Sequence, residues 1–198
     1  MIQRLPCVQC GDLIHPDTAS ANAGLCMPCK GGYRDRIEEG KRQRERDREY
    51  AKSAESLYWQ DLVRRVHKTS EGFNGLRAEE QTYFAVSCLI GEVYNGGFDQ
   101  FFSNSSGAYY LLALDGLRAL GADTCAALLL KAKEVLFVDR RVPIDREERL
   151  ELMPTFKDES ATEWAQLEPL DKAFWADPDK LGERCQTYAH ENQLYAAG

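Results

Sequence analysis

The sequence of 198 residues contains no apolar run that approaches the roughly 20 residues needed to cross a bilayer. Its start, MIQRLPCVQC, also lacks the apolar stretch that is typical of a secretory signal. We therefore expect a cytoplasmic protein with no membrane partner. Because thiols stay reduced in that compartment, paired cysteines in this sequence favour metal binding over disulfide formation.

Histidine is scarce, with 3 in the whole chain, and neither His67 nor His190 belongs to a Ser-His-Asp or metal-binding pattern. This scarcity favours a non-enzymatic protein. Long alternating runs of β-branched residues are absent as well, which confines predicted strands to the N-terminal region. The fold class that follows is mainly α: a helical C-terminal domain, a charged linker helix and a small N-terminal metal-binding module.

Basic residues are in the minority, and they are unevenly distributed. Residues 1–70 contain 13 Lys and Arg against 10 Asp and Glu, whereas residues 71–198 contain 12 against 22. The larger part of the chain thus carries a formal charge of −10, counted from the same residues. Such a surface repels nucleic acid, so we expect no direct nucleic-acid binding by the helical part.

Composition divides the chain into three predicted domains. Residues 1–32 are rich in Cys, Gly, Pro, Asp and Asn, which is the composition of turns. Residues 33–69 consist mostly of charged helix formers and predict an exposed connector helix, with Gly40 as its weak point. Residues 70–198 show helical periodicity and predict an all-α domain.

The second half of the connector carries apolar residues at helical spacing. They predict a stripe that docks on the core of the C-terminal domain, and its members are Leu57, Trp59, Leu62, Val63 and Val66.

Four of the 7 cysteines form two Cys-x-x-Cys pairs, Cys7 with Cys10 and Cys26 with Cys29. Each pair can form a tight turn that directs two sulfurs at one ion, and two such turns complete the four-thiolate site that Zn²⁺ prefers. A segment this short has little core, so a metal ion would stabilise its fold. The glycine after each pair, Gly11 or Gly31, predicts backbone N–H groups turned toward the thiolates.

This spacing over residues 5–32 resembles the zinc-ribbon family. An iron–sulfur centre fits the same spacing and stays open, whereas a thioredoxin-like redox pair would need a strand–helix unit around it. His15 is the alternative ligand, although four cysteines already complete a site. The ribbon contains few basic residues and no aromatic side chain before Tyr33. It therefore offers few side chains that could contact phosphates or stack on the bases of a nucleic acid.

The stretch NGGFDQFFSNSSG, residues 95–107, has a structural interpretation and a functional one. Structurally, Gly96 and Gly97 end a helix through a positive φ, and Ser105 or Ser106 caps the next helix. Three phenylalanines at helical spacing predict a buried turn: Phe98, Phe101 and Phe102.

Functionally, five polar residues crowd the same stretch and predict a small pocket: Asn95, Asp99, Gln100, Asn104 and Ser105. A hydrolase acting there is the enzymatic alternative, but no nucleophile with an adjacent base supports it.

Further helix boundaries follow from local signals. Gly121 predicts a C-terminal cap, and three aspartates predict N-caps, namely Asp123, Asp145 and Asp177 with Pro178 after it. The single cysteines Cys88, Cys125 and Cys185 are expected to be small core residues.

The stretch IGEVYNGGFDQFFSNSSGAYYLLALDGLRALGA, together with LEPLDKAFWADPDKLGERCQTYAHEN, resembles a bacterial helical family named after a DNA-mimic protein. The resemblance covers roughly residues 70–192, and in its second part a Leu-Asp-x-x-Phe turn precedes the final helix. It implies an all-α domain, often of unassigned function, in a family whose named member imitates DNA toward a DNA-binding protein. Domains of this kind also look like immunity proteins of toxin systems. The ribbon and the charged helix are additions to that family pattern.

From these features we expect a protein-binding regulator whose acidic face occupies a basic site on a DNA-binding protein or a toxin. A zinc-ribbon module that binds nucleic acid stays open, as does a homodimer. The expected contributors to the acidic face are Glu147, Glu148, Glu151, Asp158, Glu159 and Glu163.

Overall fold

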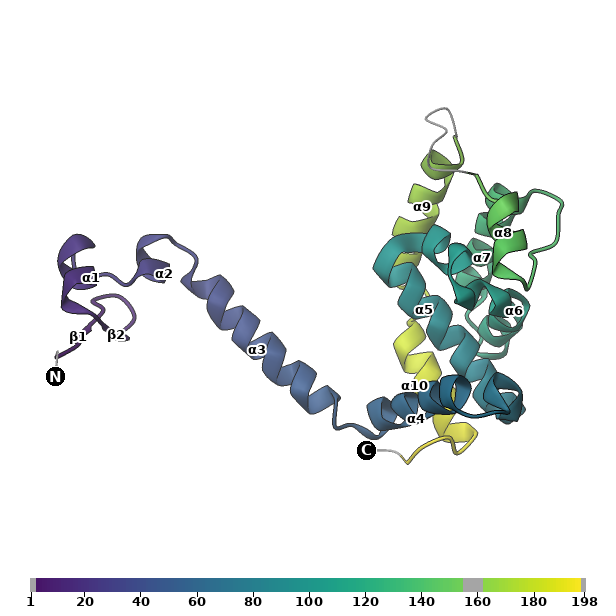
Figure 1. Ribbon diagram of the computed structural model, residues 1–198, viewed down its shortest axis with the longest axis horizontal. Helices are drawn as coiled ribbons and strands as arrows, with labels where there is room; N and C mark the ends of the chain where they lie inside the picture. Colours follow the sequence, from purple (N-terminus) through teal and green to yellow (C-terminus); the bar gives the residue numbers. More distant parts are fainter. Residues whose placement is uncertain (1–2, 155–161, 197–198) are drawn as a thin grey trace. The chain divides into compact units, whose positions relative to one another are not determined.

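The computed structural model describes residues 3–154 and 162–196. Within them, helices dominate and the strands are two short ones near the N-terminus (Figure 1). The predicted mainly α class is confirmed. The chain divides into two compact units, Met1–Ser56 and Leu57–Gly198. A search of the described helices finds none that combines the length and the apolar character required for a membrane span.

The first unit begins with a small antiparallel ribbon. Strands β1 (Leu5–Pro6) and β2 (Leu13–Ile14) pair with Leu5 opposite Ile14. Three helices follow: α1 (Pro16–Ala21), α2 (Met27–Lys30) and α3 (Arg34–Tyr50). The strands and the two short helices enclose a core made of Ile14 and buried cysteines.

The predicted connector helix is not continuous. It forms two helices, α3 and α4 (Ala54–Lys68), which are interrupted at residues 51–53. The Ser53 hydroxyl accepts a hydrogen bond from the Ser56 N–H at 3.1 Å and thereby caps the start of α4. A serine favours this capping geometry over a helix interior, which explains why the helix restarts here.

Gly40, expected as the weak point, lies inside α3. The same turns of helix are held by ion pairs from Glu39 to Arg42 and to Arg46, both at 2.8 Å. A glycine in an exposed helix interior costs only about 1 kcal/mol, so neighbouring good helix formers carry the helix through it.

The second unit contains the remaining helices. Two are 3-10 helices, η1 (Gly72–Gly75) and η2 (Ser105–Tyr109). The α-helices after α4 are α5 (Ala78–Ser103), α6 (Tyr110–Ala119), α7 (Asp123–Phe137), α8 (Arg146–Leu152), α9 (Glu163–Trp175) and α10 (Leu181–Glu191).

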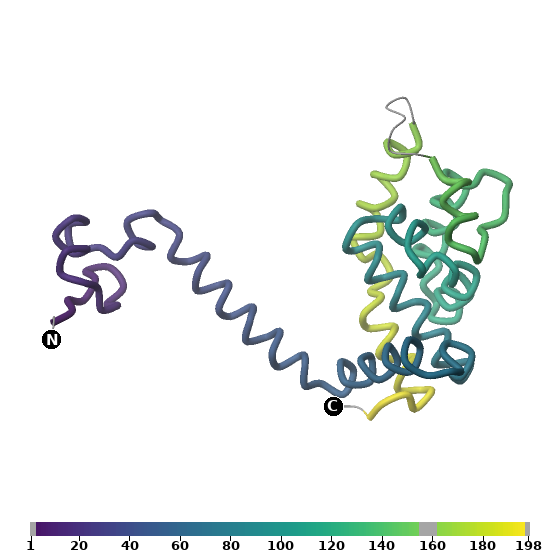
Figure 2. The backbone as a smooth tube through the Cα atoms, viewed as in Figure 1, coloured from purple at the N-terminus to yellow at the C-terminus, as the bar shows by residue number. Residues whose placement is uncertain are grey.

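Helix α5 is the centre of this unit. It packs against α6, η2, α9, α8 and α10, while α7 packs against α6 and α9. In Figure 1, α4 crosses the lower end of this bundle. The chain path in Figure 2 shows α10 returning to that end, where Tyr195 lies 5.4 Å from Tyr58 of α4, measured between ring centroids. The bundle is thus closed by elements from both ends of the unit.

The apolar stripe on α4 docks on this core as predicted, with one exception. Leu62 is fully buried, and Trp59, Val63 and Val66 pack against the core. Leu57 is 55% exposed, so its inclusion in the stripe was wrong. It lies near the start of α4, directly before Tyr58, which packs against the core.

Two predicted caps are confirmed. Gly121 has a φ of 70° directly after α6, and the Asp145 carboxylate accepts the Glu148 N–H at 2.9 Å. Of the single cysteines, Cys125 and Cys185 are buried in the core, and Cys88 packs against it half-buried.

The predicted N-caps at Asp123 and Asp177 were wrong. Asp123 is already the first residue of α7, and the Cys125 N–H is bound instead by the carboxylate of Asp179 at 2.7 Å. Helix α10 starts at Leu181, after Lys180 in a left-handed conformation. Asp177 still accepts the Leu181 N–H at 2.8 Å, but it does so from a preceding turn that also contains Pro178.

Candidate functional sites: a four-thiol centre and a helix break

The four paired cysteines come together in the first unit. Their sulfur atoms all lie within 4.8 Å of one another, and the Cys10 and Cys26 sulfurs are 3.7 Å apart. Cys7 and Cys10 belong to the turn after β1, while Cys26 is the N-cap of α2 and Cys29 lies within that helix. Cys7, Cys26 and Cys29 are buried and Cys10 is half-buried. This is a donor set that could hold one metal ion.

The electrostatics of the cluster favour a bound cation. The Cys26 N–H, 3.2 Å from the Cys7 sulfur, lowers the pKa of Cys7 to about 6, whereas burial raises the pKa of Cys29. Four adjacent thiolates repel one another. The four thiols therefore cannot all ionise in this largely buried site without a compensating positive charge. A soft divalent ion that binds thiolates supplies that charge.

The glycines beside the pairs act differently from the prediction. Gly11 has a φ of 80° and donates its N–H to the Cys7 carbonyl, while Gly31 is in helical conformation and donates to Met27. The hydrogen bond to sulfur comes from Cys26 itself. His15 lies outside the cluster: its Nδ1 accepts the Asp17 N–H at 3.3 Å and caps α1.

The second site is the break in α5 at the paired glycines. Gly96 has φ −155° and ψ 20°, and Gly97 has φ 81° and ψ −177°, so the helix stops and restarts at Phe98. The predicted positive φ at this pair is confirmed for Gly97. The three phenylalanines that follow are fully buried, as predicted.

Helix α9 supplies the hydrogen-bond partners that the break requires. Asp171 accepts the Phe98 N–H at 2.8 Å, and the indole of Trp175 donates to the Val93 carbonyl at 2.7 Å. Phe174 packs edge-to-face on Phe98, with centroids 5.4 Å apart. The predicted Leu-Asp-x-x-Phe turn was therefore wrong as a turn, because these residues form the last part of α9.

The two carboxyl groups beside the break, Asp99 and Asp171, have raised pKa values. Burial, together with the nearby Asp171 charge, raises the pKa of Asp99 to about 6, and burial also raises the pKa of Asp171. Two half-buried carboxylates therefore lie close enough to repel each other beside the break.

The polar residues predicted to form a pocket converge on Glu92 instead. Its carboxylate accepts from Gln100 at 2.6 Å, from Asn104 at 2.9 Å and from the Ser106 hydroxyl at 3.0 Å. Ser106 is thus not the expected cap of α6, and neither it nor Ser105 caps η2 with its side chain. These hydrogen bonds connect the first half of α5, which contains Glu92, to its second half and to η2. The polar residues therefore stabilise the fold.

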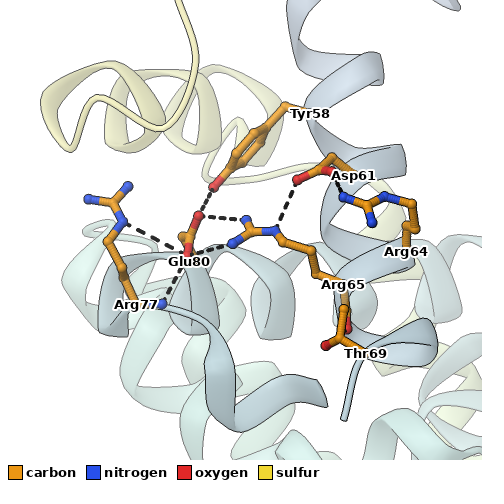
Figure 3. A network of polar contacts seen from close by, with 7 residues as sticks. All are labelled: Tyr58, Asp61, Arg64, Arg65, Thr69, Arg77 and Glu80. Carbon is orange, nitrogen blue, oxygen red and sulfur yellow. Dashed lines mark hydrogen bonds and ion pairs between the residues drawn. The ribbon is translucent and has the colours of Figure 1, made fainter. Parts of the chain in front are cut away.

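Two buried charged residues were missed by sequence reasoning. Glu80 of α5 accepts from Tyr58 at 3.1 Å, from Arg65 at 2.6 Å and from the Arg77 N–H at 2.9 Å (Figure 3). Arg65 pairs in addition with Asp61 at 2.9 Å. The position of Glu80, three residues after the N-cap of α5, is a signal that could have revealed its capping role.

Arg149 is the second such residue: it lies in the charged run DREER, residues 145–149, and a run of this kind is typical of a solvated helix face. Its side chain is fully buried and donates to the carbonyls of Phe102 and Asn104, each at 2.6 Å, and of Pro143 at 2.8 Å. Gly107 leaves the space that the guanidinium occupies, because a Cβ there would lie 2.7 Å from Arg149 Nε.

The fold and the sites define a helical protein with a four-thiol centre near its N-terminus. Residues 74–192 match the family described as DMP19-like protein, and because this is more than half of the chain, the chain belongs to that family. The match contains the helix break and Asp171, and it lies outside the cysteine cluster. No curated protein and no solved structure gives a significant match.

Proposed function

We propose that this protein is a non-enzymatic regulator that binds a protein partner by presenting an acidic surface in place of DNA. The observation that carries the proposal is membership of the DMP19-like family over residues 74–192, joined to the charge of −10 over residues 71–198. A DNA mimic needs such an excess of carboxylates, because it competes with a polyanion for the same basic site.

The burial of Arg149 supports this proposal. Helix α8 contains two arginines, but Arg149 points into the core, while Glu147, Glu148 and Glu151 remain exposed. The surface of α8 is therefore more acidic than its sequence suggests. Carboxylates three or four residues apart on a helix lie about 5–6 Å from one another, a spacing that can imitate successive phosphates.

Glu163, another member of the predicted acidic set, is the first residue of α9. Asp158 and Glu159, which belong to the same prediction, lie outside the described residues. The carboxylates of Asp99 and Asp171, which repel each other at the helix break, would gain from a cationic partner.

The partner that fits this surface is a basic protein, either a DNA-binding protein or a toxin. In the first unit we propose that Cys7, Cys10, Cys26 and Cys29 hold Zn²⁺ as a structural ion. Four thiolates match its tetrahedral preference, and the ion would stabilise a segment whose core is otherwise very small.

The test has two stages. The full-length chain is first used as bait in native lysate, and bound proteins are identified. The purified partner is then mixed with its DNA, and the chain is titrated as competitor in a gel-shift assay. We expect the chain to displace the DNA, and we expect its own binding to the partner to weaken as salt rises, because the interface depends on screened charge.

A matched pair of variants tests the location of the surface. E147Q/E151Q removes two charges from α8 and should weaken the competition, whereas E45Q/E49Q removes two exposed charges from α3 and should not. Tight binding of the wild-type chain to duplex DNA, single-stranded DNA or RNA at physiological salt would contradict the proposal and favour the zinc-ribbon nucleic-acid module. Hydrolysis dependent on Asn95–Ser105 would favour the enzymatic alternative, and light scattering on the same sample measures whether a homodimer forms.

A further inference from the structure

A cavity of about 550 Å³ lies among α6, α7, α8 and the loop before α8. This volume lies within the range of roughly 300–1,000 Å³ that is typical of binding sites for small organic molecules. Neither the proposed metal centre nor the helix break contributes a residue to it.

The apolar part of the lining consists of Tyr110, Leu111, Val142 and Ile144. Leu111 is 69% exposed and Ile144 is 79% exposed, so two aliphatic side chains at the cavity face water. Exposed apolar groups gathered around a cavity are typical of a surface that a ligand covers. They predict an apolar body for the ligand.

Two cationic side chains also line the cavity, Lys133 of α7 and Arg141 of the loop. The Lys133 ammonium donates to the Val138 carbonyl at 2.7 Å, which leaves two of its N–H groups available. Val138 has a φ of 50° and a ψ of −124°, an uncommon conformation for a β-branched residue. The hydrogen bond to this carbonyl holds the ammonium at the cavity.

Arg141 has no hydrogen bond and no ion pair within residues 3–154 and 162–196. Its neighbour Arg140, by contrast, donates to the Leu152 carbonyl. A guanidinium without a partner among the described residues, in the lining of the same cavity as an ammonium, is suited to a carboxylate, which it can bind through two parallel hydrogen bonds.

The remaining lining residues are Asp145 and Glu148. One oxygen of Asp145 accepts the Glu148 N–H, while the carboxylate of Glu148 is exposed. These acceptors would repel a second anionic group and would accept a hydrogen bond from a hydroxyl or amine on the ligand.

We infer that this cavity binds a small organic carboxylate with an apolar chain and one hydrogen-bond donor, of the kind found in hydroxylated medium-chain acids. The carboxylate meets Arg141 and Lys133, the chain covers Leu111 and Ile144, and the donor faces Glu148. This binding activity is distinct from the proposed DNA mimicry, with which it shares one exposed residue, Glu148.

Isothermal titration of the full-length protein with 3-hydroxydecanoate, decanoate and decylamine tests the inference. We expect saturable one-site binding of 3-hydroxydecanoate, weaker binding of decanoate and none of decylamine. Arg141→Gln should weaken 3-hydroxydecanoate binding by about tenfold or more, the effect of losing one charge-assisted pair. Arg140→Gln is the matched control and should leave the affinity unchanged, and Glu148→Gln should reduce the preference for the hydroxylated acid.

Circular dichroism of each variant verifies that it is folded, and Ile144→Ser provides a second, exposed position at which affinity should fall. Equal loss in the Arg140 and Arg141 variants would overturn the inference, because it would indicate a general charge effect. Binding of decylamine as tight as that of the acids, or no saturable binding of either acid, would also overturn it.

Discussion

Asp171 of α9 accepts a hydrogen bond from the backbone N–H of Phe98 at 2.8 Å, across 73 residues of sequence. The same carboxylate occupies the space beside Gly97, where a Cβ would lie 2.5 Å from its Oδ2. The carboxylate caps the restarted half of α5 and fills the gap that the glycine leaves. The two family segments recognised in the sequence therefore form one structural site.

Gly97→Ala should destabilise the second unit by more than about 1 kcal/mol, because alanine at positive φ is strained and its Cβ would displace Asp171. Urea denaturation measures the effect. Gly91→Ala is the control in the same helix: Gly91 is helical, exposed and has open space around its Cβ position, so alanine should stabilise by up to about 1 kcal/mol. Equal effects of the two substitutions would contradict the role of the break.

Asp99 should make the second unit less stable as the pH rises from about 4 to 6. Its pKa is raised from 3.8 to about 6 in the folded protein, so between these values the folded state binds a proton that the unfolded state has lost. The unfolding free energy thus falls with increasing pH in this window and stays lower above it.

Asp99→Asn should remove that fall and stabilise the protein at pH 7 by an amount on the order of 1 kcal/mol, because solvent screens much of the interaction at this half-buried site. Urea unfolding of both proteins at several pH values is the measurement. Asp115→Asn, at an exposed carboxylate paired with Arg118, is the control and should retain the fall. An unchanged pH profile in Asp99→Asn would show that another group titrates.

Glu80→Gln should destabilise the contact between α4 and α5 by about 1–3 kcal/mol, because Arg65 and Tyr58 lose a buried charged acceptor. A double-mutant cycle with Arg65→Met should give a coupling energy of at least about 0.5 kcal/mol. Glu79→Gln at the adjacent position is the control. Additive effects of the Glu80 and Arg65 substitutions would mean that the network in Figure 3 contributes little.

Cys26→Ser should abolish stoichiometric metal binding and unfold the first unit, since it removes both a thiolate and the short core around it. The thermal transition of the second unit should remain nearly unchanged, because it has a separate core. Elemental analysis and calorimetry measure the two effects. Cys88→Ser, outside the cluster, should retain the metal, and wild-type protein without stoichiometric zinc or iron would contradict the proposed centre.

Local patterns predicted the features that depend on a few neighbouring residues. The Cys-x-x-Cys spacing brought four sulfurs to one place, the paired glycines broke a helix, and Asp145 capped α8. Each Cys-x-x-Cys pair, the glycine break and the cap depend on backbone geometry within about one turn, so they can be seen in short stretches of sequence. A pocket was predicted from the polar side chains of residues 95–105, but Gln100 and Asn104 of that stretch donate hydrogen bonds to Glu92 instead.

The sequence by itself determined that this protein is helical, that four of its cysteines form two closely spaced pairs and that its larger part is acidic. The tertiary structure alone decided where its buried charges lie. Arg149 and Glu80 resemble solvated residues in sequence, yet each is buried because several acceptors or donors from distant segments meet it. Asp179 replaced Asp123 as the cap of α7 for the same reason. A buried polar group needs hydrogen-bond partners, and these can come from any part of the chain. Only the folded structure determines which donors and acceptors lie next to it.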